Sequence, residues 1–277
     1  MKQRILTGIV MAVTLIPCHF FTDTVLLVVL MVLFSTVGSF EMLRCLGYHK
    51  NVAVSLPVYL CALGLPFLAR YTSSLESFFG FAFCILFLLM FYMMSLAVVY
   101  KGKQDINRLI TAFAANFYVI FGITSIILVR DMPNGLFTYL LIFVGAWMTD
   151  IGAYFIGVLF GKHKLIPEVS PKKTVEGAVG GIAVNVLSFC IYGFVIDHFF
   201  DATPNYLAMI VTALVVSIIS MFGDLVASII KRQYGIKDYG KLFPGHGGVV
   251  DRFDSIISVA PYFVILSTIS FFFNLFS

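Results

Sequence analysis

Long hydrophobic runs, separated by short polar segments, follow one another along almost the whole chain. A helix needs about 20 apolar residues to cross a bilayer, and it satisfies its own backbone hydrogen bonds there. The pattern therefore predicts an all-α, polytopic membrane helix bundle with about nine transmembrane helices and no internal repeat. The expected spans cover residues 5–21, 24–46, 52–69, 78–99, 109–129, 136–160, 175–197, 205–230 and 254–276.

Basic residues between these runs set the expected orientation, because short cytoplasmic loops carry an excess of Lys and Arg. With the N-terminus inside, all but two of the 18 Lys and Arg residues lie in cytoplasmic segments; the exceptions are Arg70 and Arg130. We therefore expect a cytoplasmic N-terminus and an external C-terminus. No small-residue cleavage site follows the first run, so we interpret residues 5–21 as a retained span instead of a signal peptide.

Composition excludes a water-soluble globular protein. Hydrophobic residues make up 60% of the chain and charged residues 12%, about half the charged fraction of a soluble domain. The net charge of +4 is no sign of nucleic-acid binding, because the position of charge matters more than its sum. The five cysteines lack metal spacing and are interpreted as apolar filler. We expect a single integral membrane domain over residues 1–277, with N-terminal spans in 1–140 and a motif-bearing catalytic region in 145–256.

Two acidic residues interrupt the hydrophobic runs. Asp150 lies in the sixth run, where burying an uncompensated charge costs about 3 kcal/mol on insertion scales. We expect Asp150 to face a cavity or a partner, and the alternative is a structural hydrogen bond to a neighbouring helix. For Glu41, in the second run, a helix–helix hydrogen bond is the expected role.

A basic segment precedes the seventh run. Ser170-Pro171 indicates a turn, and Thr174 is a candidate N-cap for a helix that begins near Val175. The Lys172-Lys173 pair beside a helix N-terminus suits a polyanion, although a basic cytoplasmic loop with a capped helix would show the same pattern. Three small residues would allow a helix or a ligand to approach closely: Gly177, Gly180 and Gly181.

A second polar segment ends the eighth run and leads into the ninth. Asp251 and Asp254 are expected to share the first turn of the last span, after a glycine-rich loop around His246. Carboxylates, lysines and a glycine-rich loop together are what a Mg²⁺–phosphate site requires. Residues at positions i, i+4 and i+7 lie on one face of a helix, and here they are Asp224, Ser228 and Lys231.

These residues carry a resemblance to a known family. The segment Ser228-x-x-Lys231-Arg232-x4-Lys237-Asp238-x5-Pro244-x-His246-Gly247-Gly248-x-x-Asp251-Arg252-x-Asp254 resembles the signature of the phosphatidate cytidylyltransferases, also called CDP-diacylglycerol synthases. The segment 170–177 resembles the family's other motif, with Val175 where an aromatic residue is common. The resemblance covers about 145–256, and the preceding residues match only as hydrophobic spans.

The resemblance implies an enzyme that converts CTP and phosphatidic acid into CDP-diacylglycerol and pyrophosphate. It implies a Mg²⁺ requirement, assisted by a monovalent cation such as K⁺, with the metal on Asp224 and Asp251. Beyond the resemblance, we consider Asp150, Asp238 and Asp254 as further metal ligands or as partners that orient the basic residues. It also implies a homodimer in the lipid bilayer, without a nucleic-acid partner. We expect a bacterial inner membrane, from the short chain and the lack of a targeting extension, and an active site that faces the cytoplasm.

The chemistry explains the residue types. The lipid phosphate is already anionic near neutral pH, so the reaction needs positioning and charge neutralisation more than a strong base. For His246, hydrogen bonding to a phosphate, protonation of the leaving group and a structural role in the loop stay open. The expected catalytic residues are Asp224, Asp251, Lys231, Arg232 and His246. The expected substrate-binding residues are Ser170, Lys172, Lys173, Thr174, Glu176, Ser228, Lys237, Asp238, Gly247, Gly248 and Arg252.

Two other classes of protein compete with this interpretation. A transporter would use Glu41, Asp150 and Asp224 as its pathway, but it predicts inverted repeats, and the sequence contains none that we can see. A CTP-dependent lipid kinase, such as a polyprenol kinase, would transfer the γ-phosphoryl group instead. A CDP-alcohol phosphotransferase is disfavoured because its Asp-Gly-x-x-Ala-Arg motif is absent.

Overall fold

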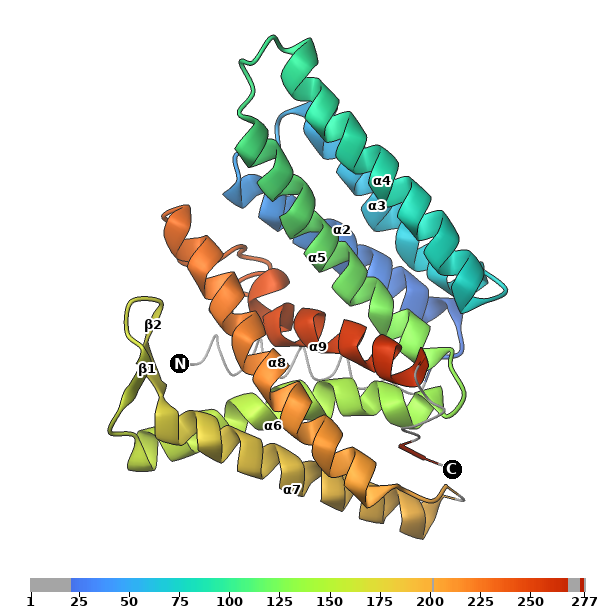
Figure 1. The fold of residues 1–277 in the computed structure, drawn as a ribbon, viewed down its shortest axis with the longest axis vertical. Coiled ribbons are helices and arrows are strands. Elements are labelled where there is room, and N and C mark those ends of the chain that lie inside the picture. The colour runs from blue at the N-terminus through green and yellow to red at the C-terminus, as the bar shows by residue number, and fades with distance from the viewer. Residues whose placement is uncertain (1–20, 201, 269–274, 277) are drawn as a thin grey trace. The chain divides into compact units, whose positions relative to one another are not determined.

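A computed structural model describes residues 21–200, 202–268 and 275–276 and is helical almost throughout these ranges (Figure 1). Seven of the described helices, α2 to α8, are long and apolar enough to cross a membrane. The prediction of an all-α, polytopic membrane bundle is therefore confirmed. The helices are α2 (Val25–Cys45), α3 (Val52–Tyr71), α4 (Leu75–Val99), α5 (Ile106–Arg130), α6 (Gly135–Phe160), α7 (Val175–Phe199), α8 (Tyr206–Gln233) and α9 (Val250–Thr268).

The expected number of nine spans is not matched among the described residues. The first expected span, residues 5–21, falls almost wholly outside them. The last is present as α9, which begins at Val250, four residues before the expected start. Because its first turns carry Asp251, Arg252 and Asp254, α9 is not one of the seven helices that qualify as spans by length and hydropathy.

The chain forms two compact units, each built from two stretches of sequence. The first unit comprises Met1–Leu128 with Gln233–Phe253, and the second comprises Val129–Arg232 with Asp254–Ser277. The division places the glycine-rich loop of the signature with the N-terminal helices. That the whole chain acts as one membrane domain stays a prediction.

Close helix packing builds the first unit. Helix α2 packs on α3, and α3 packs on α4. Gly38 of α2 lies against Val119 of α5 and Val250 at the start of α9, so that a Cβ on Gly38 would come within 2.9 Å of a Val119 methyl group. Such small residues let neighbouring backbones approach closely, which is the main source of packing energy between helices in lipid.

Helices α6 and α7 lie side by side in the second unit (Figure 1). The expected close approach at the glycines of α7 is confirmed, because a Cβ on Gly177 or Gly181 would lie 2.7 Å from a backbone oxygen of α6. Buried polar groups join α8 to this pair: Asn185 Nδ2 donates to Ser217 Oγ at 2.9 Å, and Thr149 Oγ1 lies 3.3 Å from the same oxygen. Hydrogen bonds of this kind stabilise contacts between membrane helices.

Between α6 and α7 the structure contains a β-hairpin that the sequence analysis missed. Strand β1 (Lys164–Ile166) pairs antiparallel with β2 (Ser170–Thr174), with Lys164 opposite Thr174. The expected turn at Ser170-Pro171 is wrong, since both residues lie in β2. Strands of three and five residues are too short to show the alternation of apolar and polar side chains that identifies a strand. Pro171 and the basic residues around it instead favour the prediction of a loop.

Candidate active site

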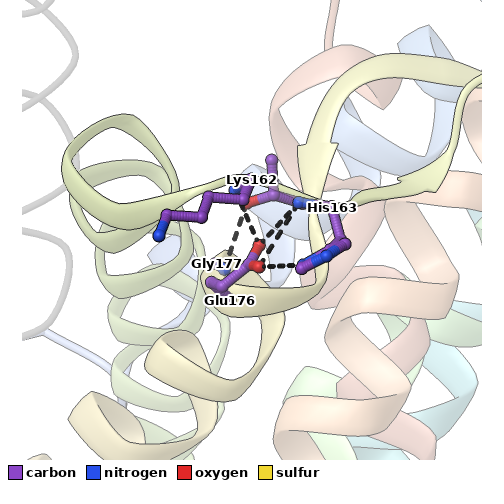
Figure 2. A network of polar contacts seen from close by, with 5 residues as sticks. Lys162, His163, Glu176 and Gly177 are labelled. Atoms are coloured by element: carbon purple, nitrogen blue, oxygen red, sulfur yellow. Dashed lines mark hydrogen bonds and ion pairs between the residues drawn. The ribbon is translucent and has the colours of Figure 1, made fainter.

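One carboxylate in the first turn of α7 binds the segment just before the hairpin (Figure 2). Glu176 Oε2 accepts the backbone N–H of Lys162 at 3.0 Å and that of His163 at 3.2 Å, and Oε1 lies 2.6 Å from His163 Nδ1. Thr174 is the N-cap of α7, as predicted, and its hydroxyl accepts the N–H of Gly177 at 3.1 Å. Glu176 therefore orients the hairpin, and its expected contact with substrate stays a prediction.

A lysine of strand β2 forms an ion pair with a carboxylate on α8. Lys173 Nζ lies 2.6 Å from Asp224 Oδ2, and the two side chains are 25% and 31% exposed. Ser228 Oγ donates to the other carboxylate oxygen of Asp224 at 3.4 Å, which confirms that these two residues share a helical face. The structure thus brings together a residue from each of the two polar motifs within one unit.

Asp150 of α6 is the second acid in this region. Its Oδ2 lies 3.3 Å from the hydroxyl oxygen of Ser255, which also lies 3.3 Å from the carbonyl oxygen of Ser220. Asp150 and Asp224 both line a cavity of about 430 Å³. Asp150 therefore lines a cavity, as expected, and it also accepts the hydrogen bond from a neighbouring helix that was the alternative.

The cavity has a basic part and an apolar part. Lys164, Lys172 and Lys173 of the hairpin contribute the cations. Ala153, Tyr154 and Val158 of α6 contribute apolar surface, and the last two side chains are 66% and 67% exposed in the isolated chain. A cavity with this lining is suited to an amphipathic anion, because the polar and apolar parts of such a ligand have separate partners.

The glycine-rich loop belongs to the first unit and folds around Asp251, which is 8% exposed. Asp251 Oδ2 accepts three backbone N–H groups, from Tyr239 at 2.7 Å, Gly240 at 3.3 Å and Gly248 at 2.9 Å. Gly247 adopts φ +92°, a left-handed conformation that glycine tolerates, and a Cβ there would lie 2.7 Å from the same oxygen. One oxygen of Asp251 therefore holds the loop together.

His246 lies at the tip of this loop. Its backbone carbonyl oxygen accepts a hydrogen bond from Arg252 Nε at 2.6 Å, and its N–H donates to the Phe243 carbonyl oxygen at 2.8 Å. The Nδ1 atom is buried without a hydrogen-bond partner among the described residues. The loop thus fixes the backbone at His246, and the three roles considered for its side chain stay open.

The remaining basic residues of the signature mark the segment that joins α8 to the loop. Lys231 and Arg232 lie in the last turn of α8, where cations interact favourably with the helix dipole. Arg232, Lys237 and Asp238 are exposed. Their expected contacts with phosphates stay predictions.

The acids of the second unit fit a Mg²⁺ ion in their chemistry. Mg²⁺ is usually held by one or two carboxylates together with phosphate oxygens, and Asp150 and Asp224 line one cavity. Among the described residues, no group of three or more His, Cys, Asp and Glu side chains is arranged to hold a metal. Phosphate oxygens or water would therefore complete the coordination. Metal binding by Asp251 or Asp254 stays a prediction; Asp254 Oδ1 accepts the N–H of Ser255 at 2.8 Å.

The helix–helix hydrogen bond expected for Glu41 of α2 is confirmed by its bond to Val250 of α9, whereas the contacts of α2 with the glycine-rich loop were missed. Glu41 accepts backbone N–H groups of Val249 and Val250, and Arg44 donates to the carbonyl oxygen of Tyr239. The only local signal was an acid inside an apolar run, which does not reveal a partner 208 residues away.

Comparison with known proteins supports the similarity over nearly the whole chain. The family described as "Cytidylyltransferase family" matches residues 2–270. A phosphatidate cytidylyltransferase of Bacillus subtilis (strain 168) is 33% identical over 269 residues, which cover 96% of this chain and 97% of the relative. A protein of the same name from Staphylococcus haemolyticus (strain JCSC1435) is 32% identical over 266 residues, covering 96% and 98%. The similarity therefore includes the N-terminal helices as well as the motifs.

Proposed function

The chain belongs to the cytidylyltransferase family, and from this premise we propose that it is a phosphatidate cytidylyltransferase. It is a nucleotidyltransferase that converts CTP and phosphatidic acid into CDP-diacylglycerol and pyrophosphate. An oxygen of the lipid phosphate attacks the α-phosphorus of CTP. The bond from that phosphorus to the β-phosphate bridging oxygen breaks, and pyrophosphate leaves.

The cavity of the second unit is the structural observation that carries this proposal. The lysines of the hairpin and the acids Asp150 and Asp224 line it together with apolar side chains of α6. Phosphatidic acid has a compact anionic head and two acyl chains, so the head matches the lysines and the chains match the exposed apolar surface of Tyr154 and Val158. CTP supplies the second polyanion.

Charge neutralisation is the main task of the protein in this reaction. Lys172 and Lys173 offset the repulsion between the two phosphate-bearing substrates, and the Asp224 carboxylate holds Lys173 in place between turnovers. The hairpin keeps these lysines beside the cavity because Glu176 ties it to α7. Mg²⁺, bound through Asp224 and Asp150, would polarise the phosphate oxygens and stabilise the leaving pyrophosphate.

The membrane location follows from the helices, and its details belong to the proposal. The seven apolar helices are those of a multi-pass membrane protein, and the two relatives described above come from bacteria. We place the chain in the cell membrane with the hairpin lysines on the cytoplasmic side, in keeping with the excess of Lys and Arg in cytoplasmic loops. A homodimer, implied by resemblance alone, is part of the same proposal.

Label transfer tests the reaction. Purified protein in nanodiscs containing phosphatidic acid is incubated with Mg²⁺ and with CTP labelled at the α- or the γ-phosphate. We expect label in the lipid from α-labelled CTP only. Label from γ-labelled CTP would instead identify a lipid kinase, and incorporation from neither would overturn the proposal in favour of a transporter or an inactive relative. Lys103→Ala, in the exposed loop between α4 and α5, serves as a control that should keep full activity.

A further inference from the structure

Glu41 is an acid in the C-terminal half of α2, and its side chain is only 2% exposed. Its two carboxylate oxygens accept two consecutive backbone N–H groups: Oε1 from Val249 at 3.1 Å and Oε2 from Val250 at 3.0 Å. These are N–H groups at the start of α9, which have no acceptor within their own helix. Glu41 therefore caps α9 from another part of the chain, and its charge also suits the N-terminal end of the helix dipole.

Two glycines leave room for this carboxylate. Gly240 and Gly248 both lie against Glu41, so that a Cβ on either residue would overlap the carboxylate group. Gly248 is part of the signature. The steric need for glycine at these positions comes from Glu41, because the loop backbone passes directly over the acid.

Arg44 adds a second contact one turn further along α2. Its Nη2 donates to the backbone carbonyl oxygen of Tyr239, at the other end of the same loop. Asp251 binds the loop from the α9 side through the N–H groups of Tyr239, Gly240 and Gly248. The segment 239–250 is thus held at both ends by α2 and from within by α9.

We infer that Glu41 is a positioning residue that holds the signature loop, and with it His246 and Asp251, in the geometry required for turnover. The inference rests on the proposed function, since it assigns Glu41 a part in the same reaction. Glu41 contacts the backbone of the loop, so it acts through the loop. The bond from Val250 is the expected helix–helix hydrogen bond, and the bond from Val249 extends the contact of Glu41 into the loop.

The substitution Glu41→Gln tests this role with little change of shape. It replaces one acceptor oxygen by an NH₂ group, so one of the two amides loses its partner. We expect kcat to fall about 100-fold, as for small misplacements of reacting groups, with little change in the KM for phosphatidic acid. Hydrogen exchange of the 239–250 amides should speed up, while exchange in α3 and α4 stays unchanged. Glu76→Gln is the matched control, because Glu76 is an exposed acid in the first turn of α4.

A second pair of variants keeps the test decisive if Glu41→Gln fails to insert. Gly240→Ala would force the loop away from Glu41 and should reproduce the faster loop exchange and the loss of kcat. Gly80→Ala is its control, because a Cβ at that exposed position of α4 would meet nothing within 4 Å. Unchanged loop exchange and unchanged kcat in both Glu41→Gln and Gly240→Ala would overturn the inference. If the unmodified protein forms no nucleotide–lipid product, the proposed function fails, whereas the loop exchange still reports on the positioning role.

Discussion

The two units use acidic side chains in opposite ways. In the second unit, Asp224 faces the lysine of a hairpin, and with Asp150 it lines a cavity. In the first unit, Glu41 and Asp251 are buried and bind backbone N–H groups of one loop. A carboxylate paired with a partly buried lysine can release the lysine to a phosphate and bind a metal ion in its place. A carboxylate bound to several amides instead fixes the shape of the backbone. We therefore expect carboxylates of the first kind to take part in the reaction and those of the second kind to shape the backbone.

The largest effect is expected for Asp224→Asn. The substitution removes the charge that holds Lys173 and that would bind Mg²⁺, so turnover should fall below detection while the protein still inserts. Loop exchange in 239–250 should not change, because the loop amides are bound by Asp251 and Glu41. Normal Mg²⁺-dependent activity in this variant would contradict the assignment.

Lys173→Ala should lower kcat by about 100- to 1000-fold, the usual effect of removing a charged donor from a reacting oxyanion. Lys173→Arg should retain part of the activity, since it keeps the charge. Steady-state kinetics with both substrates check this, and equal activity in the Ala variant and the unmodified enzyme would remove Lys173 from the site.

Asp251→Asn is expected to affect the loop more than Asp224→Asn does. The substitution weakens the acceptor for three buried N–H groups, and each unsatisfied donor costs about 1–3 kcal/mol. We expect lost activity together with rapid exchange of the amides in 239–250. If activity is lost while the amides of 239–250 still exchange slowly, Asp251 acts only as a metal ligand. The contrast drawn between the acids of the two units would then be wrong.

Glu176→Gln should have the smallest effect. The carboxylate fastens an exposed hairpin through contacts that solvent screens, so we expect the KM for CTP to rise about two- to fivefold with kcat nearly unchanged. Initial-rate measurements at varied CTP concentration check this. A loss as large as that of Lys173→Ala would mean that Glu176 contacts substrate directly.

The spans were predictable because the bilayer imposes a length and a polarity on each of them. Helix α6 was expected at 136–160 and observed at Gly135–Phe160, and α7 was expected at 175–197 and observed at Val175–Phe199. The N-cap at Thr174 followed from local chemistry alone. Such features depend on a few neighbouring residues, which a single sequence contains.

The missed features depend on contacts between distant residues or on very short elements. The bonds from Glu41 to Val249 and Val250 join positions about 200 residues apart, and no local pattern predicts them. The early start of α9 has the same origin, because its first amides are satisfied by α2. The hairpin was missed because its strands are too short to show the alternating pattern that distinguishes a strand from a loop. The motif residues were found by resemblance, and most of their roles stay predictions.

The most direct test of the account is the stoichiometry of the products. Purified protein in phosphatidic acid nanodiscs is given CTP and Mg²⁺, and lipid products are identified by mass spectrometry while pyrophosphate is measured enzymatically. The account predicts one pyrophosphate for each CDP-diacylglycerol formed, and neither product with Asp224→Asn or after chelation of the metal. Release of CDP with a pyrophosphorylated lipid, or no consumption of CTP by the unmodified protein, would contradict it.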